Sequence, residues 1–269
     1  MVYFLLYITT VSTNYNSKIN QLINAQPPGI VYLSSWLVAN GYSHNLQQRY
    51  KKSNWLKSIG AGALVRVNDK LNYEGAVYAL QAQANLTIHP GAKTALSILG
   101  KAHYLELSAG RILLFGGTTE KLPLWFKRYN WGAKLEYHPT NFLPSDLGLI
   151  DHDTSTFSIR ISGAARAMME CLYLAPKRQD LVECFQLMEG LNNLSPQKVQ
   201  VLLEQCQSVK VKRLFLYMAE KAKHQWVEYL DMDKIDLGKG KRSVVKNGSF
   251  VRKYAITVPK ELEESGESI

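Results

Sequence analysis

The stretch Ser34–Trp55, SSWLVANGYSHNLQQRYKKSNW, predicts a helix-turn-helix motif around which the rest of the chain is organised. Two short helices are expected, over Ser35–Asn40 and His44–Ser53. Gly41 separates them, because glycine most easily adopts the left-handed conformation that ends a helix. A serine, Ser34 or Ser43, precedes each helix, and its hydroxyl is expected to accept a free amide of the first turn. A helix, a glycine turn and a second helix are the order of a helix-turn-helix.

The second of these helices has two chemically different faces. Its apolar residues recur every four positions, so they share one side and are expected to face a core: Tyr42, Leu46 and Tyr50. The opposite face carries amides and cations without an acid: Gln47, Gln48, Lys51 and Lys52. Glutamine can pair with an adenine edge and lysine can reach guanine or a phosphate. We therefore expect this face to bind duplex DNA, with Ser43 and His44 at the helix start. The alternative is an ordinary helical hairpin with a solvated basic face.

Short helical and strand patterns surround this motif in the order of a winged helix. A helix is expected over Ser17–Ala25, and two strands, Leu56–Ile59 and Ala63–Val67, are expected to pair around glycines as the wing. Lys57 and Arg66 of the wing are expected to touch phosphates, contacts that position a protein without reading sequence. A plain hairpin with two solvated cations is the alternative.

The remaining chain indicates a larger second domain. Residues 86–158 alternate short helices and strands, among them His103–Leu107 paired with Arg111–Phe115. The part beyond is mostly helical, and its longest expected helix is Ser208–Leu230. The predicted class is therefore α+β. An apolar extension at 1–16 precedes a winged helix-turn-helix domain at 17–85, a mixed α/β, largely helical domain at 86–260 and a solvated tail at 261–269.

The net charge of +10 is concentrated in two regions. Residues 1–85 hold seven Lys/Arg and two acids, a net +5. Val209–Lys253 holds twelve Lys/Arg against five acids, a net +7. Because like charges repel, a second basic surface far from the helix-turn-helix suggests a polyanionic or acidic partner. Its residues are expected on one helix face and on a glycine turn: Lys210, Lys212, Arg213, Lys239, Lys241 and Arg242. A solvated basic face is the alternative.

Compartment and chemistry signals are sparse. Three cysteines, Cys171, Cys184 and Cys206, are odd in number and lie in apolar helical contexts, which favours buried free thiols in a reducing cytoplasm. The apolar start lacks the features of a secretory signal and is too short to span a bilayer, so no membrane role is expected.

Catalytic motifs, phosphate-binding loops and zinc motifs are missing, so neither a cofactor nor a catalytic or metal site is expected. Two DxD pairs, Asp151/Asp153 and Asp231/Asp233, could in principle hold a metal for phosphoryl transfer. Nucleotidyltransferases normally place Gly-Ser upstream of such a pair, and neither pair has it. A loop or helix-end role is therefore favoured for both.

Several stretches covering about Ser17–Pro259 together resemble the AbiEi antitoxins of bacterial abortive-infection, type IV toxin–antitoxin systems. The stretches are GIVYLSSWLVANGYS, YKKSNWLKSIGAGALVRV, YEGAVYALQAQANLTIHPGAKTALSILGKAHYL, LPLWF, LSPQKVQVLLEQCQSVKVKRLFLYMAEKAKHQW and IDLGKGKR with KYAITVP. The combination is specific, although no single motif decides it. The apolar extension before about Asn14 has no counterpart in the family.

The resemblance implies a winged-helix domain that represses its own operon at promoter inverted repeats. It also implies a C-terminal domain that neutralises a cognate nucleotidyltransferase-type toxin, with the helix SVKVKRLFLYMAE and the turn GKGKR in that domain. The free protein is expected to be a monomer, with two copies on DNA. Two alternatives remain: a winged-helix transcription factor with an unrelated sensory domain, and a metal-dependent enzyme built on a DxD pair.

Overall fold

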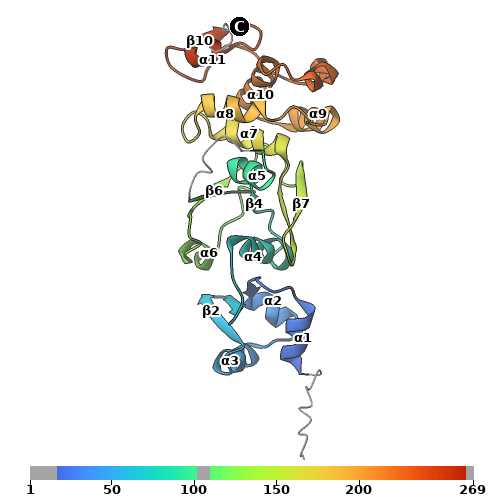
Figure 1. Cartoon of the computed structure of the whole chain (residues 1–269), viewed down its shortest axis with the longest axis vertical. Coiled ribbons are helices and arrows are strands. Elements are labelled where there is room, and N and C mark those ends of the chain that lie inside the picture. Colours follow the sequence, from blue (N-terminus) through green and yellow to red (C-terminus); the bar gives the residue numbers. More distant parts are fainter. Residues whose placement is uncertain (1–16, 102–109, 265–269) are drawn as a thin grey trace, which may run out of the picture.

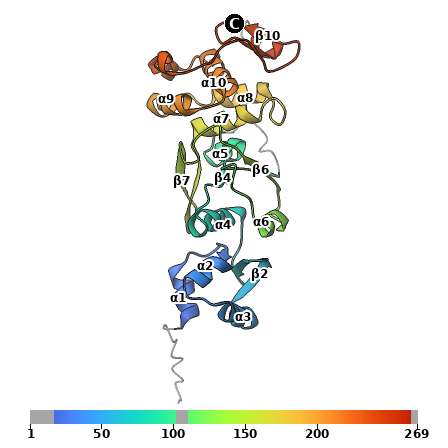
Figure 2. The same cartoon turned by 180° about the vertical axis from the view of Figure 1, so that it is seen from behind.

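The computed structural model describes residues 17–101 and 110–264 of the 269-residue chain. Three parts follow one another along an elongated molecule, as Figure 1 shows: a helix-turn-helix with its wing at one end, small sheets in the middle and a helical part at the other end. The view from behind shows the same arrangement (Figure 2). The mixed α+β class predicted from the sequence is confirmed.

The N-terminal part is a winged helix, as predicted. Its helices are α1 (Lys18–Ala25), α2 (Ser34–Ala39) and α3 (His44–Lys52). Its strands are β1 (Tyr32–Leu33), β2 (Leu56–Gly60) and β3 (Ala63–Arg66), which form an antiparallel sheet in the order β1-β3-β2. Ser17 caps α1 and Ser43 caps α3 through their hydroxyls. Gly41 has a φ of +85°, a left-handed backbone conformation that glycine adopts easily because it has no Cβ.

Apolar side chains from all three helices and the sheet form the core of this part. Its buried members are Ile19, Leu22, Ile30, Tyr32, Leu37, Tyr50, Leu56 and Leu64. Tyr42 and Leu46 pack against them, so the predicted inner face of α3 is confirmed.

The middle part begins with α4 (Tyr73–Tyr78), which continues as a π-helical turn, η1 (Ala79–Gln83). A sheet in the order β4-β5-β6 follows, made of β4 (His89–Pro90), β5 (Arg111–Gly116) and β6 (Lys134–Pro139). Strands β5 and β6 run parallel. The hairpin of β7 (Leu149–Asp153) and β8 (Ser158–Ser162) forms a separate sheet. Helices α5 (Ala92–Ile98) and α6 (Leu124–Arg128) complete this part.

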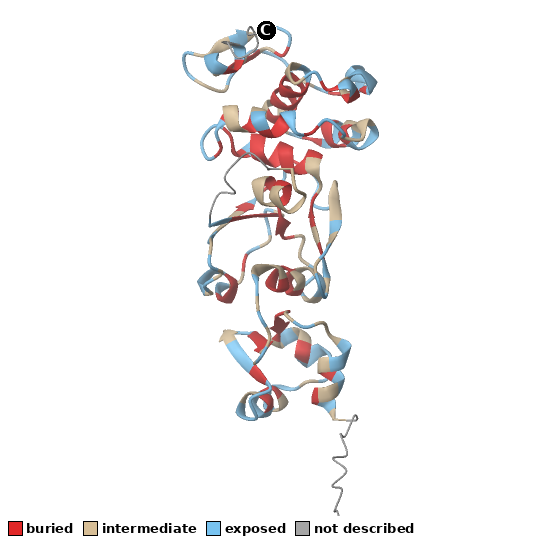
Figure 3. Cartoon of the chain, in the orientation of Figure 1, coloured by how far each residue is buried: buried red, intermediate tan, exposed pale blue. Residues whose placement is uncertain are grey.

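One apolar core joins the winged helix to the middle sheets. Val31 and Val65 of the winged helix belong to the same buried cluster as Leu80, Ile112 and Ile159. Figure 3 shows buried segments along the molecule across this junction. At Gly75 an added Cβ would lie 1.9 Å from the backbone oxygen of Gly29, so only glycine allows this approach of α4 to the winged helix. The boundary expected at residue 85 therefore lies within a continuous core.

The C-terminal part is helical and ends in a small sheet. Its helices are α7 (Ala164–Leu174), α8 (Leu181–Glu189), α9 (Pro196–Gln205), α10 (Val209–Lys221) and α11 (Lys260–Glu264). The 3-10 turns η2 (Gln225–Tyr229) and η3 (Met232–Lys234) follow α10. The strands β9 (Arg242–Ser243), β10 (Ser249–Val251) and β11 (Ile256–Val258) form a sheet in the order β10-β11-β9.

Three local expectations were wrong. The longest helix ends at Lys221 rather than Leu230, and Lys223 has a φ of +55°, which a helix does not continue through. The Asp151/Asp153 pair, expected in a loop or at a helix end, lies on the strand β7. Leu262 is buried, so residues 261–264 are not a solvated tail. The expected strand His103–Leu107 and the extension at 1–16 lie outside the described residues.

Candidate nucleic-acid interface and basic C-terminal surface

A groove of about 250 Å³ runs between α3 and the wing. His44, Gln48 and Lys51 of α3 line one side, and they are spaced four and three residues apart, so they share one stripe of the helix. The other side is the wing backbone around Gly60 and Gly62, where the chain turns back. A side-chain stripe opposite an exposed turn offers both base-reading and phosphate-binding groups.

Gln47 does not belong to the outer face of α3, and its expected DNA contact is wrong. Its side chain is only 4% exposed. Its amide nitrogen donates to the carbonyl oxygens of Tyr42, at 2.8 Å, and Ser34, at 3.2 Å. The Ser34 hydroxyl donates to the Gln47 amide oxygen at 2.7 Å, so Ser34 is not the cap of α2. Gln47 therefore holds the two helices of the motif together.

Arg66 is a structural residue as well, and its expected phosphate contact is wrong. Its guanidinium donates to the Tyr32 hydroxyl and to the carbonyl oxygens of Ile23 and Gln26, at 2.9, 2.8 and 2.6 Å. Burial raises the pKa of Tyr32, although the nearby Arg66 opposes that rise. Arg66 thus fastens the wing to the end of α1.

The other DNA-binding candidates reach the surface. Lys51 is half-buried along the groove, and the rest are exposed: Ser43, His44, Gln48, Lys52 and Lys57. The hydroxyl of Ser43 is engaged as the cap of α3. Arg49 is exposed in the last turn of the same helix. It was not among the DNA-binding candidates predicted from the sequence, although its place on the expected helix indicated an exposed cation.

A second cationic element, α6, lies directly beside the wing. An added Cβ on Gly60 would lie 2.6 Å from the Cβ of Trp125, so the wing and α6 are in close contact. Lys127 and Arg128 are exposed in the last turn of α6. Nothing in the local sequence places them next to the wing, because the contact depends on the three-dimensional packing.

The expected basic face of α10 is buried. Lys212 and Arg213 are 4% and 3% exposed. The Arg213 guanidinium donates to four backbone oxygens, those of Leu237, Gly238, Gly240 and Ala255, at 2.7 to 3.1 Å. The expected surface role of Arg213 is therefore wrong, because this side chain fixes the turn that follows.

Lys210 and Lys212 do not form an exposed surface either. The Lys210 ammonium donates to the carbonyl oxygens of Tyr173 and Ala175, at 2.9 and 2.5 Å, and burial lowers its pKa. Both lysines were expected on an exposed face, and that expectation is wrong because α10 packs inside the helical part.

The glycine turn itself does present cations. Gly238 and Gly240 have φ values of +63° and +78°, which few other residues adopt. Lys239, Lys241 and Arg242 are exposed on this turn. The Lys241 ammonium lies 5.1 Å from the centroid of the exposed Phe250 ring. We call Lys239, Lys241 and Arg242 the basic turn.

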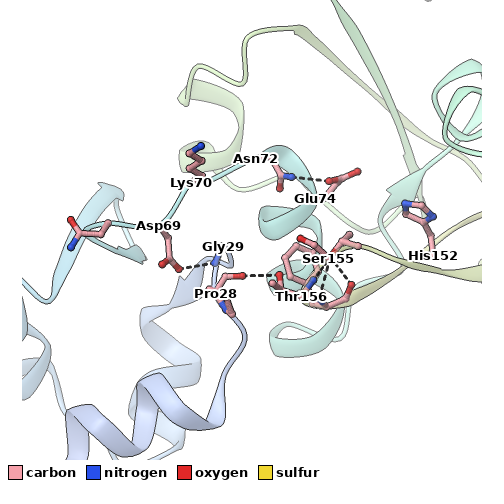
Figure 4. A pocket seen from close by; sticks show the side chains of 12 residues that line it. Pro28, Gly29, Asp69, Lys70, Asn72, Glu74, His152, Ser155 and Thr156 are labelled. Atoms are coloured by element: carbon pink, nitrogen blue, oxygen red, sulfur yellow. Dashed lines mark hydrogen bonds between the residues drawn. The ribbon is translucent and has the colours of Figure 1, made fainter.

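A polar pocket of about 440 Å³ lies at the junction of the winged helix and the middle part, and Figure 4 shows it from close by. The Gly29 amide donates to the Asp69 carboxylate at 2.6 Å, and the Thr156 hydroxyl donates to the Pro28 oxygen at 3.1 Å. Both contacts tie the turn that follows α1 to segments later in the chain. The pocket therefore belongs to the joint between the two parts.

The acidic pairs considered for metal binding do not form a metal-type cluster. Asp151 and Asp153 are exposed on β7, and Asp231 pairs with Lys234 at 2.9 Å. Among the described residues, no three His, Cys, Asp or Glu side chains gather as metal ligands would.

Within 17–101 and 110–264, no helix has the length and apolarity to cross a bilayer. The three cysteines are free and buried, as predicted, and burial raises their pKa values.

A buried carboxylate joins the middle sheet to the helical part. Glu170 is fully buried and accepts from Arg166 Nε at 2.9 Å, the Ser162 hydroxyl at 2.8 Å and the Ala92 amide at 2.8 Å. His89 Nε2 lies 3.3 Å away. Burial alone would raise the pKa of Glu170, but the bonds to His89 and the charge of Arg166 outweigh it and hold that pKa below its ordinary value. This network is structural, since its members are enclosed.

A winged helix that shares one core with the middle sheets, followed by a helical C-terminal part, places this chain in the winged-helix class. Residues 15–107 match the N-terminal domain of the transcriptional regulators called AbiEi antitoxins, and residues 109–259 match the AbiEi antitoxin transcriptional regulators of type IV toxin–antitoxin systems. The chain belongs to this family.

A solved structure supports the fold. The chain is similar to the RV2827C protein from Mycobacterium tuberculosis, with a TM-score of 0.55 and 13% identity over 88% of each chain. At that identity the likeness concerns the fold alone. No match is found among curated proteins.

Proposed function

We propose that the winged helix binds inverted repeats in the promoter of its own operon and represses it in the cytoplasm. The observation that supports this most directly is the groove in which His44, Gln48 and Lys51 face the wing. Gln48 can read an adenine edge and Lys51 can bind guanine or a phosphate. Lys52 and Lys57 are exposed at the edges and can neutralise the backbone.

We further propose that the free protein is a monomer and that two copies occupy each inverted repeat. Each half-site is expected to bind one copy of α3, the reader helix. Sedimentation of the free protein and of its complex with a promoter duplex tests this. A tight dimer in the absence of DNA would contradict it.

We also propose that the C-terminal part neutralises a nucleotidyltransferase-like toxin through the basic turn. Three exposed cations on a turn that Arg213 holds in place are suited to an acidic protein surface. A buried α10 leaves this turn as the part of the expected surface that a toxin can reach.

Paired substitutions in the full-length chain separate the two activities. The variant K239E/K241E/R242E should lose rescue of cells that express the cognate toxin, while it still shifts the promoter fragment. The variant Q48A/K51A/K52A should lose the promoter shift and retain rescue. Lys246→Glu, a single exposed cation outside the turn, serves as the control. Full rescue by the first variant would exclude the basic turn, and a normal shift by the second would exclude α3.

The full-length chain is needed because a cut at residue 85 divides the shared core. Val31, Val65 and Leu80 would lose their contact with Ile112 and Ile159. A loss of activity in a fragment cut at residue 85 would therefore not distinguish a lost binding surface from a misfolded core.

A further inference from the structure

A broad basic hollow of about 660 Å³ lies where the middle part meets the helical C-terminal part, and it shares no lining residue with the α3 groove or the basic turn. The N-terminal ends of the parallel strands β5 and β6 form one wall, and the turn between α7 and α8 forms the other. Its charged lining is Arg111, Lys134, Glu136, Lys177, Arg178 and Asp180. Four cations thus surround one volume together with two carboxylates.

Both carboxylates are already engaged. Glu136 Oε1 lies 3.3 Å from Lys134 Nζ and 3.7 Å from an Arg111 nitrogen. The Asp180 carboxylate accepts the first amides of α8, at 2.8 and 3.0 Å. Lys177 and Arg178 are exposed and have no carboxylate partner in the described part of the chain. The wall made by the α7–α8 turn therefore carries two cations, Lys177 and Arg178, against the single carboxylate of Asp180.

A buried histidine behind the hollow carries an unused donor. Arg178 Nη1 lies 3.3 Å from His138 Nδ1, and because a guanidinium only donates, Nδ1 accepts and the ring proton is on Nε2. Burial and the charge of Arg178 lower the pKa of His138, which favours the neutral ring. Nε2 is buried without a hydrogen-bond partner among the described residues, and the nearest Glu136 oxygen is 3.9 Å away. An unsatisfied buried donor destabilises a fold, which makes it an indicator of a missing interaction.

We propose that this hollow binds a small phosphoryl anion, of the pyrophosphate or nucleoside polyphosphate class. Such an anion is drawn to Lys177 and Arg178 and competes with Glu136 for Arg111 and Lys134. The released Glu136 carboxylate can then turn and accept a hydrogen bond from the N–H of His138 Nε2. One ligand thereby compensates the free cations and satisfies the buried donor.

The charge arrangement favours a compact polyanion over a nucleic-acid duplex. The cations converge from two walls on one concave volume, whereas a duplex needs a stripe of cations along its length. This activity goes beyond promoter binding and toxin neutralisation, and it does not depend on either.

Calorimetric titration of the full-length protein tests the proposal, with inorganic pyrophosphate in one arm and ATP in the other, both without a metal. We expect saturable binding by the unsubstituted protein. The affinity of K177E/R178E should be lower by about tenfold at least, because charge-assisted bonds to the phosphate are lost. The control K246E/K260E makes the same change in net charge at exposed lysines elsewhere and should leave the affinity within about twofold. Lys134→Glu alone provides a second variant on the opposite wall.

Nitrogen-15 spectra of the histidine rings supply an independent readout. The His138 signals, identified by their loss in His138→Gln, should shift on addition of pyrophosphate in the unsubstituted protein and stay in place in K177E/R178E. Tighter binding of ATP than of pyrophosphate would assign a nucleotide ligand, and equal binding would assign the phosphoryl group alone. Titrations without saturation, or equal weakening by K246E/K260E, would overturn the proposal. K177E/R178E should still shift the promoter fragment normally. A loss of anion binding in this variant can therefore be distinguished from a loss of DNA binding by α3.

Discussion

Ser34 and Gln47 exchange two hydrogen bonds across the helix-turn-helix. The Ser34 hydroxyl donates to the Gln47 amide oxygen at 2.7 Å, and the Gln47 amide nitrogen donates back to the Ser34 carbonyl oxygen at 3.2 Å. This pair sets α3 against the start of α2, so two adjacent glutamines of one helix have different roles.

Gln47→Ala should destabilise the fold, whereas Gln48→Ala should change DNA recognition. Removing Gln47 leaves buried carbonyl oxygens without donors, which costs about 1–3 kcal/mol in the free energy of unfolding. Gln48 is exposed, and its loss should cost about 1–3 kcal/mol only at particular base pairs. Urea unfolding and competition among mutated promoter duplexes measure the two effects. Equal unfolding midpoints for both variants would refute the assignment.

The contact between α6 and the wing predicts a wider DNA footprint. K127A/R128A should lower the slope of log affinity against log salt concentration by about two, because each lost phosphate contact contributes roughly 0.9. Lys57→Ala on the wing should lower it by about one. Filter binding of a promoter duplex over a range of salt concentrations gives these slopes. An unchanged slope for K127A/R128A, with Lys57→Ala behaving as expected, would limit the interface to α3 and the wing.

Arg213→Met should loosen the C-terminal sheet without exposing a new charge. Four backbone oxygens lose a donor, and each buried acceptor left unpaired costs about 1–3 kcal/mol. Hydrogen exchange should therefore accelerate in the basic turn and in β9–β11, while α7 keeps its protection. Lys239→Met, at an exposed position of the same turn, is the matched control. Protection of the turn that is unchanged in Arg213→Met would show that Arg213 does not hold it.

Glu170→Gln should remove a pH-dependent share of stability. The folded-state pKa of Glu170 is lowered, so its contribution is complete above the ordinary value of 4.5 and is lost as the pH falls through the folded-state pKa. At neutral pH the variant should be less stable by roughly 3 kcal/mol, because Arg166 keeps a buried charge without its partner. Urea unfolding at several pH values checks this. The difference between the two proteins should narrow below 4.5, and a constant difference would contradict the assignment.

The sequence was sufficient for the features that neighbouring residues determine. Gly41 and the Ser43 cap mark the turn and the start of α3, and the glycines near Gly60 mark the wing. Apolar spacing placed Tyr50 in the core. These signals act within a few residues, so local rules capture them.

The roles of buried polar side chains were beyond those local rules. Gln47 binds a residue 13 positions away, Arg66 binds Ile23 across 43 positions, and Arg213 binds Ala255 across 42. Each side chain is long enough to be solvated or buried, and only the fold decides which. The same distance effect concealed the hollow between β6 and the α7–α8 turn, whose walls are about 40 residues apart in the chain, as His138 and Arg178 show.

The elongated shape keeps α3 and the basic turn at opposite ends of the molecule (Figure 1). A toxin seated on the basic turn would stand clear of a duplex held by α3, so the two partners need not compete for space. Because the winged helix and the middle sheets share one core, a toxin would not detach the repressor merely by occupying its far end. Repression would then depend on the total concentration of antitoxin, with or without bound toxin, and not on the concentration of the toxin.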